Sequence, residues 1–201
     1  MLKKLSFLRY SRNYGKPRRT NQCAERWSEG PSSVGVADPL LIGEYNVIDK
    51  PKIKQTGIRD VLFGKNVTVV EPVNLYECRI GDNCFIGPFV EIQKGVVIGN
   101  NCKIQSHAFI CELVTIGFDC FISHGVMFIN DTFASGGPAR GDKKLWKPTY
   151  IGNHVSIGSN ATILPVKIVD NTVIGAGAVV TKDILEPGIY AGNPARKLKD
   201  L

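Results

Sequence analysis

Three histidines, His107, His124 and His154, are the side chains of this chain best suited to move a proton near neutral pH. His124 lies in the segment ISHGVMFIND, just before a polar stretch that begins with Asn130 and Asp131, and is the best candidate for a general base. His154 has the setting of a surface corner residue. Their spacings of 17 and 30 residues leave no clustered pair, so a three-histidine zinc site is not indicated and no metal is expected.

The elements that would position these side chains follow from a six-residue period. Apolar residues recur at Ile80, Ile86, Ile92, Ile98, Ile104, Ile110, Ile116, Ile122 and Phe128, and again at Ile151, Ile157, Ile163, Ile168, Ile174 and Val180, where the last three follow the loss of one residue. A period of six fits neither a helix nor an ordinary strand, and short repeats of this kind are typical of a β-helix. Three sixes complete one coil, with the first and the small fifth residue of each six turned inward.

The period divides the chain into three parts. Residues 1–40 form an irregular basic extension, residues 41–182 form the β-helix, and residues 183–201 leave it through Pro187 and become helical after Pro194. A polar segment rich in glycine and proline, 129–150, interrupts the period and is predicted to be an excursion loop. The entering coils carry a blurred period at Ile42, Ile48, Ile53, Val61, Val67 and Val73, with one extra residue before Ile80.

Three of the six cysteines support the same architecture. Cys84, Cys102 and Cys120 are spaced by 18 residues, which is one full coil, so they are predicted to stack on the inner wall. Small apolar packing explains them better than disulfide bonds. Cys23, Cys78 and Cys111 show no metal-type spacing, and a reducing cytoplasm is the expected location.

The distribution of charge argues against a nucleic-acid partner, and the hydropathy argues against a membrane span. The net charge is +7, but residues 1–40 carry eight basic and three acidic side chains and so account for most of it. The repeats themselves offer no basic groove for nucleic acid. No apolar run reaches the roughly 18 to 20 residues of a membrane span.

The repeats, with the C-terminal segments GAGAVVTKD and AGNPARK, resemble the hexapeptide-repeat acyltransferases. This resemblance covers roughly residues 61–201. It implies an all-β fold, the left-handed parallel β-helix. It further implies a homotrimer that binds acetyl-coenzyme A (acetyl-CoA) in a cleft between neighbouring subunits.

Two further segments, CKIQSHAFICELVTIGFDCFISHGVMFIND and PARG, are similar to the nucleotide-sugar N-acetyltransferases of that superfamily. The branch that they resemble most acetylates the 3-amino group of dTDP-3-amino-3,6-dideoxyhexoses, and relatives use UDP sugars. The implied pathway is the synthesis of bacterial surface polysaccharides such as O-antigen or S-layer glycans.

The resemblance assigns acceptor roles to residues around the loop. Asn130 matches a residue that holds the sugar or the reacting amine, which makes it a catalytic candidate beside His124. Arg140 matches a loop arginine that grips the diphosphate. Other candidates for the acceptor site are His107, Glu112, Asp131 and, less directly, Gln105. Each of these has a plainer reading as a solvated or structural side chain, and Asp131 could instead pair with a basic residue.

The resemblance also assigns the coenzyme site. Ser159 and Ala176 stand where backbone groups follow the pantetheine arm, and Thr181 and Lys182 stand near the nucleotide end. Arg196 and Lys199 would meet the coenzyme phosphates, for which cationic side chains have an electrostatic reason.

Three alternatives stay open. One is O-acetylation of a sugar hydroxyl by the same fold, although the excursion loop contains no histidine of the kind that the O-acetylating branch uses. The second is a zinc hydratase of the γ-carbonic anhydrase type, which the histidine spacing disfavours. The third is a non-catalytic β-helix scaffold.

Overall fold

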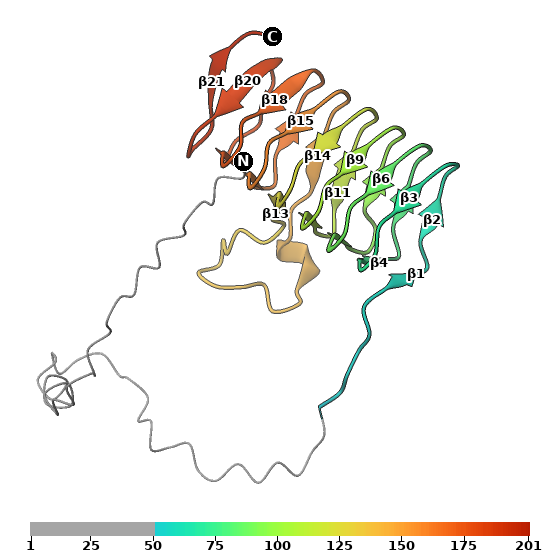
Figure 1. Ribbon diagram of the computed structural model, residues 1–201. Coiled ribbons are helices and arrows are strands. Elements are labelled where there is room, and N and C mark those ends of the chain that lie inside the picture. The colour runs from blue at the N-terminus through green and yellow to red at the C-terminus, as the bar shows by residue number, and fades with distance from the viewer. Residues whose placement is uncertain (1–50) are drawn as a thin grey trace, which may run out of the picture. The chain divides into compact units, whose positions relative to one another are not determined.

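The computed structural model describes residues 51–201 (Figure 1). Its strands all belong to one compact unit, Ile53–Leu201. The expected extension at 1–40 and the repeat positions Ile42 and Ile48 lie outside the described residues. Within residues 51–201, no helix is long and apolar enough to cross a membrane.

The strands form three sheets, which we name A, B and C. Sheet A contains β1 (Ile58–Arg59), β4 (Asn74–Tyr76), β7 (Glu91–Ile92), β10 (Phe109–Ile110), β13 (Met127–Phe128), β16 (Thr162–Ile163) and β19 (Val179–Val180). Sheet B contains β2 (Leu62–Phe63), β5 (Arg79–Ile80), β8 (Val97–Ile98), β11 (Val114–Ile116), β14 (Thr149–Ile151) and β17 (Lys167–Ile168). Sheet C contains β3 (Thr68–Val69), β6 (Phe85–Ile86), β9 (Lys103–Ile104), β12 (Phe121–Ile122), β15 (Ser156–Ile157), β18 (Thr172–Ile174), β20 (Gly188–Ala191) and β21 (Arg196–Lys199).

Each coil visits the three sheets in turn, so hydrogen-bonded neighbours within a sheet are parallel strands from successive coils. Figure 1 shows the coils stacked one on the next. The chain bends at three edges, which we name A–B, B–C and C–A after the sheets they join. The fold class expected from the sequence, the left-handed parallel β-helix, is confirmed.

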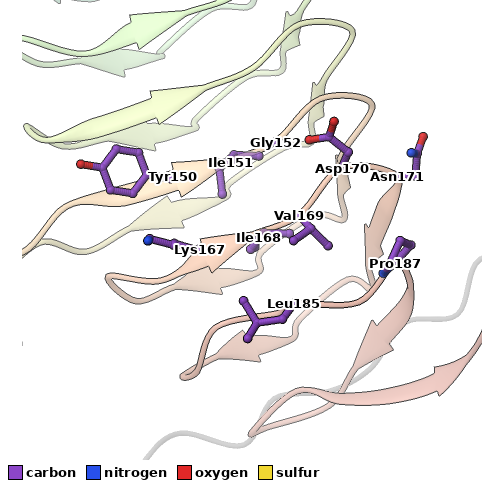
Figure 2. A pocket seen from close by; sticks show the side chains of 10 residues that line it. All are labelled: Tyr150, Ile151, Gly152, Lys167, Ile168, Val169, Asp170, Asn171, Leu185 and Pro187. Carbon is purple, nitrogen blue, oxygen red and sulfur yellow. The ribbon is translucent and has the colours of Figure 1, made fainter.

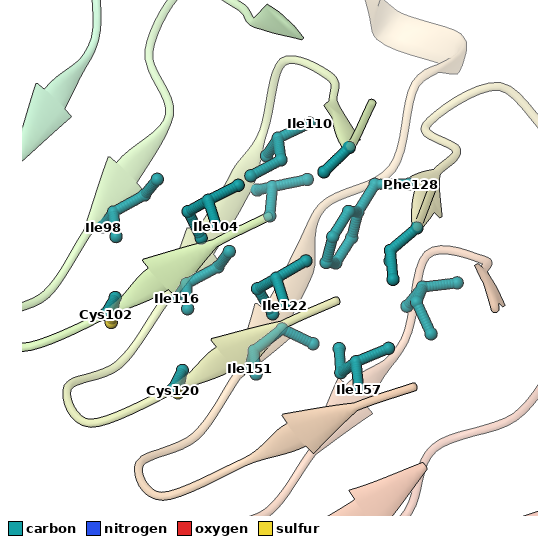
Figure 3. Close-up of a cluster of buried hydrophobic side chains, with 14 of the residues drawn as sticks. Ile98, Cys102, Ile104, Ile110, Ile116, Cys120, Ile122, Phe128, Ile151 and Ile157 are labelled. Carbon is teal, nitrogen blue, oxygen red and sulfur yellow. The ribbon is translucent and has the colours of Figure 1, made fainter. Parts of the chain in front are cut away.

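The core is a stack of inward side chains, as the six-residue period predicted. Ile86, Ile104, Ile122 and Ile157 follow one another along sheet C and are fully buried. Figure 3 shows the last three of them within the core. The fifth residues are buried as well: Cys84, Val90, Val96, Cys102, Ala108, Val114, Cys120 and Val126. Each buried aliphatic side chain contributes roughly 1.5–3 kcal/mol through its removal from water. A single coil could not bury these residues alone.

The phase predicted for the entering coils was wrong. The inward positions there are Phe63, Val69 and Leu75, which pair with Ile80, Ile86 and Ile92 of the next coil. Val61, Val67 and Val73 are instead fifth residues, and the step from Leu75 to Ile80 is one residue short rather than one too long. Ile53 lies outside the strands with 83% of its surface exposed, so it is no part of the core.

Irregular spacing is confined to the A–B edge. The inward residues are six apart across the B–C and C–A edges in every described coil. At the A–B edge the step is five residues from Ile58, from Leu75 and from Ile163. The excursion leaves at this same edge, between the end of β13 at Phe128 and the start of β14 at Thr149, and contains a 3₁₀ turn, η3 (Lys143–Leu145). The three sheets thus form the sides of a triangular prism. The residue spacing is constant at two of its edges and variable at the third.

The C-terminal segment differs from the sequence-based expectation of a helix after Pro194. β20 joins sheet C parallel to β18, and β21 returns antiparallel to β20, with Arg196 opposite Ala191 and Lys197 opposite Tyr190. The unpaired edge of β20 offers hydrogen-bond partners to the backbone of β21. An isolated helix of so few residues would be marginal in water, so this pairing prevails.

The three stacked cysteines are free thiols with a structural role. The thiols of Cys84, Cys102 and Cys120 donate to backbone carbonyl oxygens of the next coil, those of Gly99, Gly117 and Gly152, at 3.1–3.2 Å. Hydrogen bonding with the neighbouring thiols of Cys120 and Cys84, together with burial, raises the pKa of Cys102, which keeps it protonated and able to donate. In a later coil the corresponding corner residue is Thr172, whose hydroxyl donates to the Val169 carbonyl oxygen at 2.9 Å.

We predict that Cys102→Ala lowers the free energy of unfolding by about 1–2 kcal/mol, because it leaves the Gly117 carbonyl oxygen without its donor and opens a small void. Cys102→Thr, which restores a donor, should recover part of the loss. Urea unfolding followed by circular dichroism measures both. Equal stability of wild type and Cys102→Ala would show that the thiol contacts contribute nothing.

Candidate active site

The C–A edge carries a column of paired corner residues, one pair per coil. The pairs are Pro88–Phe89, Ser106–His107, His124–Gly125, Ser159–Asn160 and Ala176–Gly177. The second residue of each pair has a left-handed backbone. Its N–H donates to the first residue of the preceding coil's pair, as from Gly125 to Ser106 at 3.0 Å and from Asn160 to His124 at 2.9 Å. This C–A column therefore brings four predicted residues, His107, His124, Ser159 and Ala176, into line.

His124 is held by a partner that sequence reasoning did not single out. Its Nδ1 lies 2.8 Å from the Ser106 hydroxyl oxygen in the coil before. In the tautomer in which Nδ1–H donates to the Ser106 hydroxyl oxygen, Nε2 carries the free lone pair. Glycine suits the next position, Gly125, because its φ is +67° and a Cβ there would approach the Asn160 side-chain oxygen too closely. The spacing of 18 residues between Ser106 and His124, one full coil, was the signal that could have revealed the pair.

The other two histidines lie in different surroundings. The His107 ring stacks on Phe89, with ring centroids 4.8 Å apart and planes inclined by 31°. His154 lies at the B–C edge, where it packs edge-on against Phe118 and is 3.7 Å from an Asp119 carboxylate oxygen. His107 thus belongs to the column, and His154 is a surface corner residue.

Asn130 and Asp131 shape the base of the excursion. The Asn130 side-chain amide donates to the Glu112 carbonyl oxygen at 3.2 Å, and the Asn130 carbonyl oxygen accepts from the Lys147 N–H at 2.9 Å. The Asp131 carboxylate accepts the backbone N–H groups of Phe133 at 2.9 Å and Ala139 at 2.7 Å. Both predicted residues are therefore engaged in closing the loop on itself.

Glu112 belongs to the same cluster. Its carboxylate is paired with the Lys143 ammonium of the excursion at 2.6 Å, and its side chain is only 18% exposed. The Glu112 N–H is held by the Gln93 side-chain oxygen at 3.3 Å. The structure thus gathers Glu112, Asn130 and Asp131 at the A–B edge. Lys143 was missed because nothing in the sequence spacing of a loop residue points to its partner.

The remaining acceptor candidates are less constrained. Arg140 follows the anchored Ala139, is exposed, and has a left-handed backbone (φ 49°). Gln105 is half-buried and precedes the Ser106–His107 corner, where its carbonyl oxygen accepts from Ala108 N–H at 3.4 Å.

His124 and Asn130 lie on different edges of the prism. They flank β13, so the width of sheet A separates them, and six extended residues span up to about 20 Å. The structure does not bring these two catalytic candidates together within one chain.

Three predicted coenzyme residues line one pocket at the C-terminal end. Thr181, Lys182 and Arg196 surround a cavity of about 370 Å³, which we name the C-terminal pocket, together with Tyr190 and Lys197. Lys199, on β21, does not line it. Ser159 lies in the C–A column, with its hydroxyl 2.8 Å from that of buried Ser123, and Ala176 stands one coil further on.

A second pocket, of about 450 Å³, lies on sheet B and the B–C edge (Figure 2). Tyr150, Lys167, Asp170, Leu185 and Pro187 are among its lining residues, and none of the predicted site residues is. Across residues 51–201, no group of three or more His, Cys, Asp or Glu side chains is arranged to hold a metal ion.

Family models match the repeats on both sides of the excursion. Residues 77–112 match the bacterial transferase hexapeptide (six repeats), and residues 148–182 match the hexapeptide repeat of succinyl-transferase. Among curated proteins, the chain is 30% identical over 186 residues to the bifunctional protein GlmU of Clostridium acetobutylicum, covering 84% of this chain and 40% of that protein. It is 37% identical over 111 residues to GlmU of Clostridium botulinum, covering 55% and 22%. The chain thus spans well under half the length of these relatives.

Solved structures share the fold. AntD, an N-acyltransferase from Bacillus cereus crystallised with dTDP and coenzyme A, superimposes with a TM-score of 0.62 at 25% identity, covering 70% of this chain and 83% of that one. A galactoside acetyltransferase in complex with coenzyme A gives a TM-score of 0.51 at 29% identity, covering 71% and 65%. The repeats thus match models of hexapeptide transferases, and the described part of the chain shares its fold with solved acyltransferases.

We predict that Asp131→Asn loosens the excursion, because an amide offers one oxygen to the two N–H groups that the carboxylate now accepts. The loss of one hydrogen bond, about 1 kcal/mol, should speed trypsin cleavage at Arg140 several-fold. Limited proteolysis followed by mass spectrometry measures the rate. Asp119→Asn at the B–C edge is the matched control, and equal rates for both variants and wild type would contradict the role of Asp131.

Proposed function

We propose that the protein is an acetyl-CoA-dependent N-acetyltransferase of the 3-amino group of a nucleotide-linked amino-deoxy sugar, carried on dTDP or on UDP. Its product would serve bacterial surface polysaccharide synthesis. The observation that carries the proposal is the Ser106-bound His124, which stands in one column with Ser159 and Ala176. The likeness to AntD, an N-acyltransferase crystallised with dTDP and coenzyme A, supports the donor and the nucleotide.

The chemistry is acyl transfer from a thioester to an amine. The neutral amine attacks the thioester carbonyl carbon, the C–N bond forms, and the C–S bond breaks to release the coenzyme thiol. In this proposal Nε2 of His124 accepts the proton that the nitrogen loses, and the departing thiolate finally receives it. Ser106 holds the imidazole through Nδ1, so that Nε2 can act as the base.

The separation of His124 and Asn130 supports an assembly in which two subunits build each site. If both residues act on one substrate, the C–A edge of one subunit must meet the A–B edge of another. A homotrimer of prisms, with three equivalent clefts, satisfies this requirement by closed symmetry. In such a cleft, Glu112, Asn130, Asp131 and Arg140 would hold the sugar and its diphosphate, with His107 lining the opposite side.

The coenzyme would lie toward the C-terminal end of the cleft. Ser159 and Ala176 would follow the pantetheine arm, and the cationic groups of the C-terminal pocket, Lys182 and Arg196, would meet its phosphates. Exposed Lys199 would add charge on the strand that also carries Arg196, β21. The acceptor then enters from the N-terminal side, where the excursion lies.

A hydroxyl acceptor is the second candidate, and the likeness to a galactoside acetyltransferase at 29% identity favours keeping it in view. The chemistry would be the same, except that the attacking oxygen must lose its proton earlier. A scaffold without activity is the remaining alternative.

The proposal is tested by thiol release from acetyl-CoA with paired amino and hydroxy sugars, each free and linked to dTDP or UDP. We expect turnover only with a nucleotide-linked amino sugar, accompanied by amide formation in the mass spectrum. Acetylation of hydroxy sugars alone would establish the second candidate. A scaffold would show no thermal stabilisation by acetyl-CoA, whereas a ligand at 100 times its Kd adds about 2.7 kcal/mol.

We predict that His124→Ala lowers kcat about 10²- to 10⁴-fold, because the variant lacks the proton acceptor. The KM for acetyl-CoA should change little. His154→Ala, at the B–C edge, is the control and should keep wild-type rates. If kcat of His124→Ala stays near that of wild type, the base is not His124, and the thiolate takes the proton directly.

A further inference from the structure

Phe89 is an unusual residue for its corner. It has a left-handed backbone (φ 60°) and 57% of its surface is exposed. Other second residues of the C–A column, such as Gly125, Asn160 and Gly177, are types that accept this backbone readily. This backbone is strained for a large aromatic residue, and Phe89 buries little surface in return. An exposed aromatic side chain on a strained backbone indicates a binding role.

Phe89 also lines a pocket. A cavity of about 270 Å³, which we name the N-terminal pocket, lies between Phe89, Pro72 and Val73, with Thr56, Asn74 and Glu91 completing its lining. His107 packs against the Phe89 ring from the next coil and supports it. The site is thus a flat apolar surface with two polar side chains beside it.

The two polar groups have defined hydrogen-bonding capacity. The Asn74 side-chain oxygen accepts from the Arg59 guanidinium at 3.1 Å, which orients the amide and leaves its N–H₂ as a donor. One Glu91 carboxylate oxygen accepts from the Gln93 amide at 2.8 Å, and the other remains an acceptor. A donor beside an acceptor matches the adjoining C=O and N–H groups of a pyrimidine imide, as in thymine and uracil.

The pocket lies on the side of His124 opposite the coenzyme residues. Phe89 is two coils toward the N-terminus from the His124–Gly125 corner, which is about 10 Å by strand spacing. Ser159 and Ala176 lie in the other direction. An acceptor whose amine is at His124 therefore extends its nucleotide toward Phe89.

We propose that Phe89 and the N-terminal pocket bind the pyrimidine base of the acceptor nucleotide, the base stacking on the Phe89 ring and its imide meeting Asn74 and Glu91. The identity of the ligand as part of a nucleotide sugar rests on the proposed function. Stacking of a base on an aromatic side chain contributes about 1–3 kcal/mol.

The test is binding of dTDP, without sugar or coenzyme, to the full chain by isothermal titration calorimetry. Phe89→Leu should weaken binding about 5- to 150-fold, the equivalent of the stacking contribution, while Phe89→Tyr stays within a few-fold of wild type. Phe118→Leu is the matched control, because Phe118 is also an exposed aromatic corner residue that packs on a histidine, but at the B–C edge. It should bind as wild type does.

CDP should bind at least tenfold more weakly than dTDP, because cytosine lacks the imide N–H and the second carbonyl beside it. The proposal is overturned if Phe89→Leu binds dTDP as wild type does, if CDP binds equally well, or if wild type binds neither dTDP nor UDP. If dTDP binding depends on Phe89 but no amino sugar is acetylated, the proposed function is refuted and the proposal that Phe89 binds the base stands. If amino sugars are acetylated but Phe89→Leu binds dTDP as wild type does, the proposed function stands and the proposal for Phe89 is refuted.

Discussion

The register between successive coils is the constraint on which the rest of the structure depends. An inward residue in one coil packs on its counterpart in the next, so a residue gained or lost between two inward positions must be absorbed where the chain bends. The protein meets this constraint at two edges by keeping the inward positions six residues apart. It relaxes the constraint only at the A–B edge, where steps of five and the whole excursion occur without disturbing the stack. The B–C and C–A edges thereby keep the coils in register, whereas variation in chain length occurs at the A–B edge.

Because the spacing at the C–A edge is constant, residues that are one coil apart in the sequence lie next to each other in space. Ser106 and His124 meet because they are one coil apart, and Phe89 and His107 stack for the same reason. The A–B edge is assembled differently. There Glu112 and Asn130 meet by coil spacing, but Lys143 reaches Glu112, and Ala139 reaches Asp131, through the path of the loop. One edge is therefore rigidly specified, and the other is shaped by local hydrogen bonds.

This difference explains what could be predicted from the sequence. The inward positions from Ile80 onward, the buried cysteines and the column of four site residues follow from counting. The entering coils were assigned the wrong phase because first and fifth residues are both apolar there, so Val61 and Phe63 fit the period equally well. The strand at Arg196–Lys199 depends on pairing with β20, and the ion pair of Glu112 with Lys143 depends on loop closure. Neither is encoded in a local pattern.

The reversal of direction at β21 has a consequence for the solenoid as a polymer. A stack of parallel coils ends in open strand edges onto which another copy could add, coil upon coil. At the C-terminal end of sheet C, β21 runs antiparallel along the outermost position and bears exposed Arg196, Lys197 and Lys199. A charged strand of the wrong polarity is a poor template for a further parallel strand. Within the described residues, β21 therefore covers the parallel edge of sheet C to which a further coil would otherwise pair.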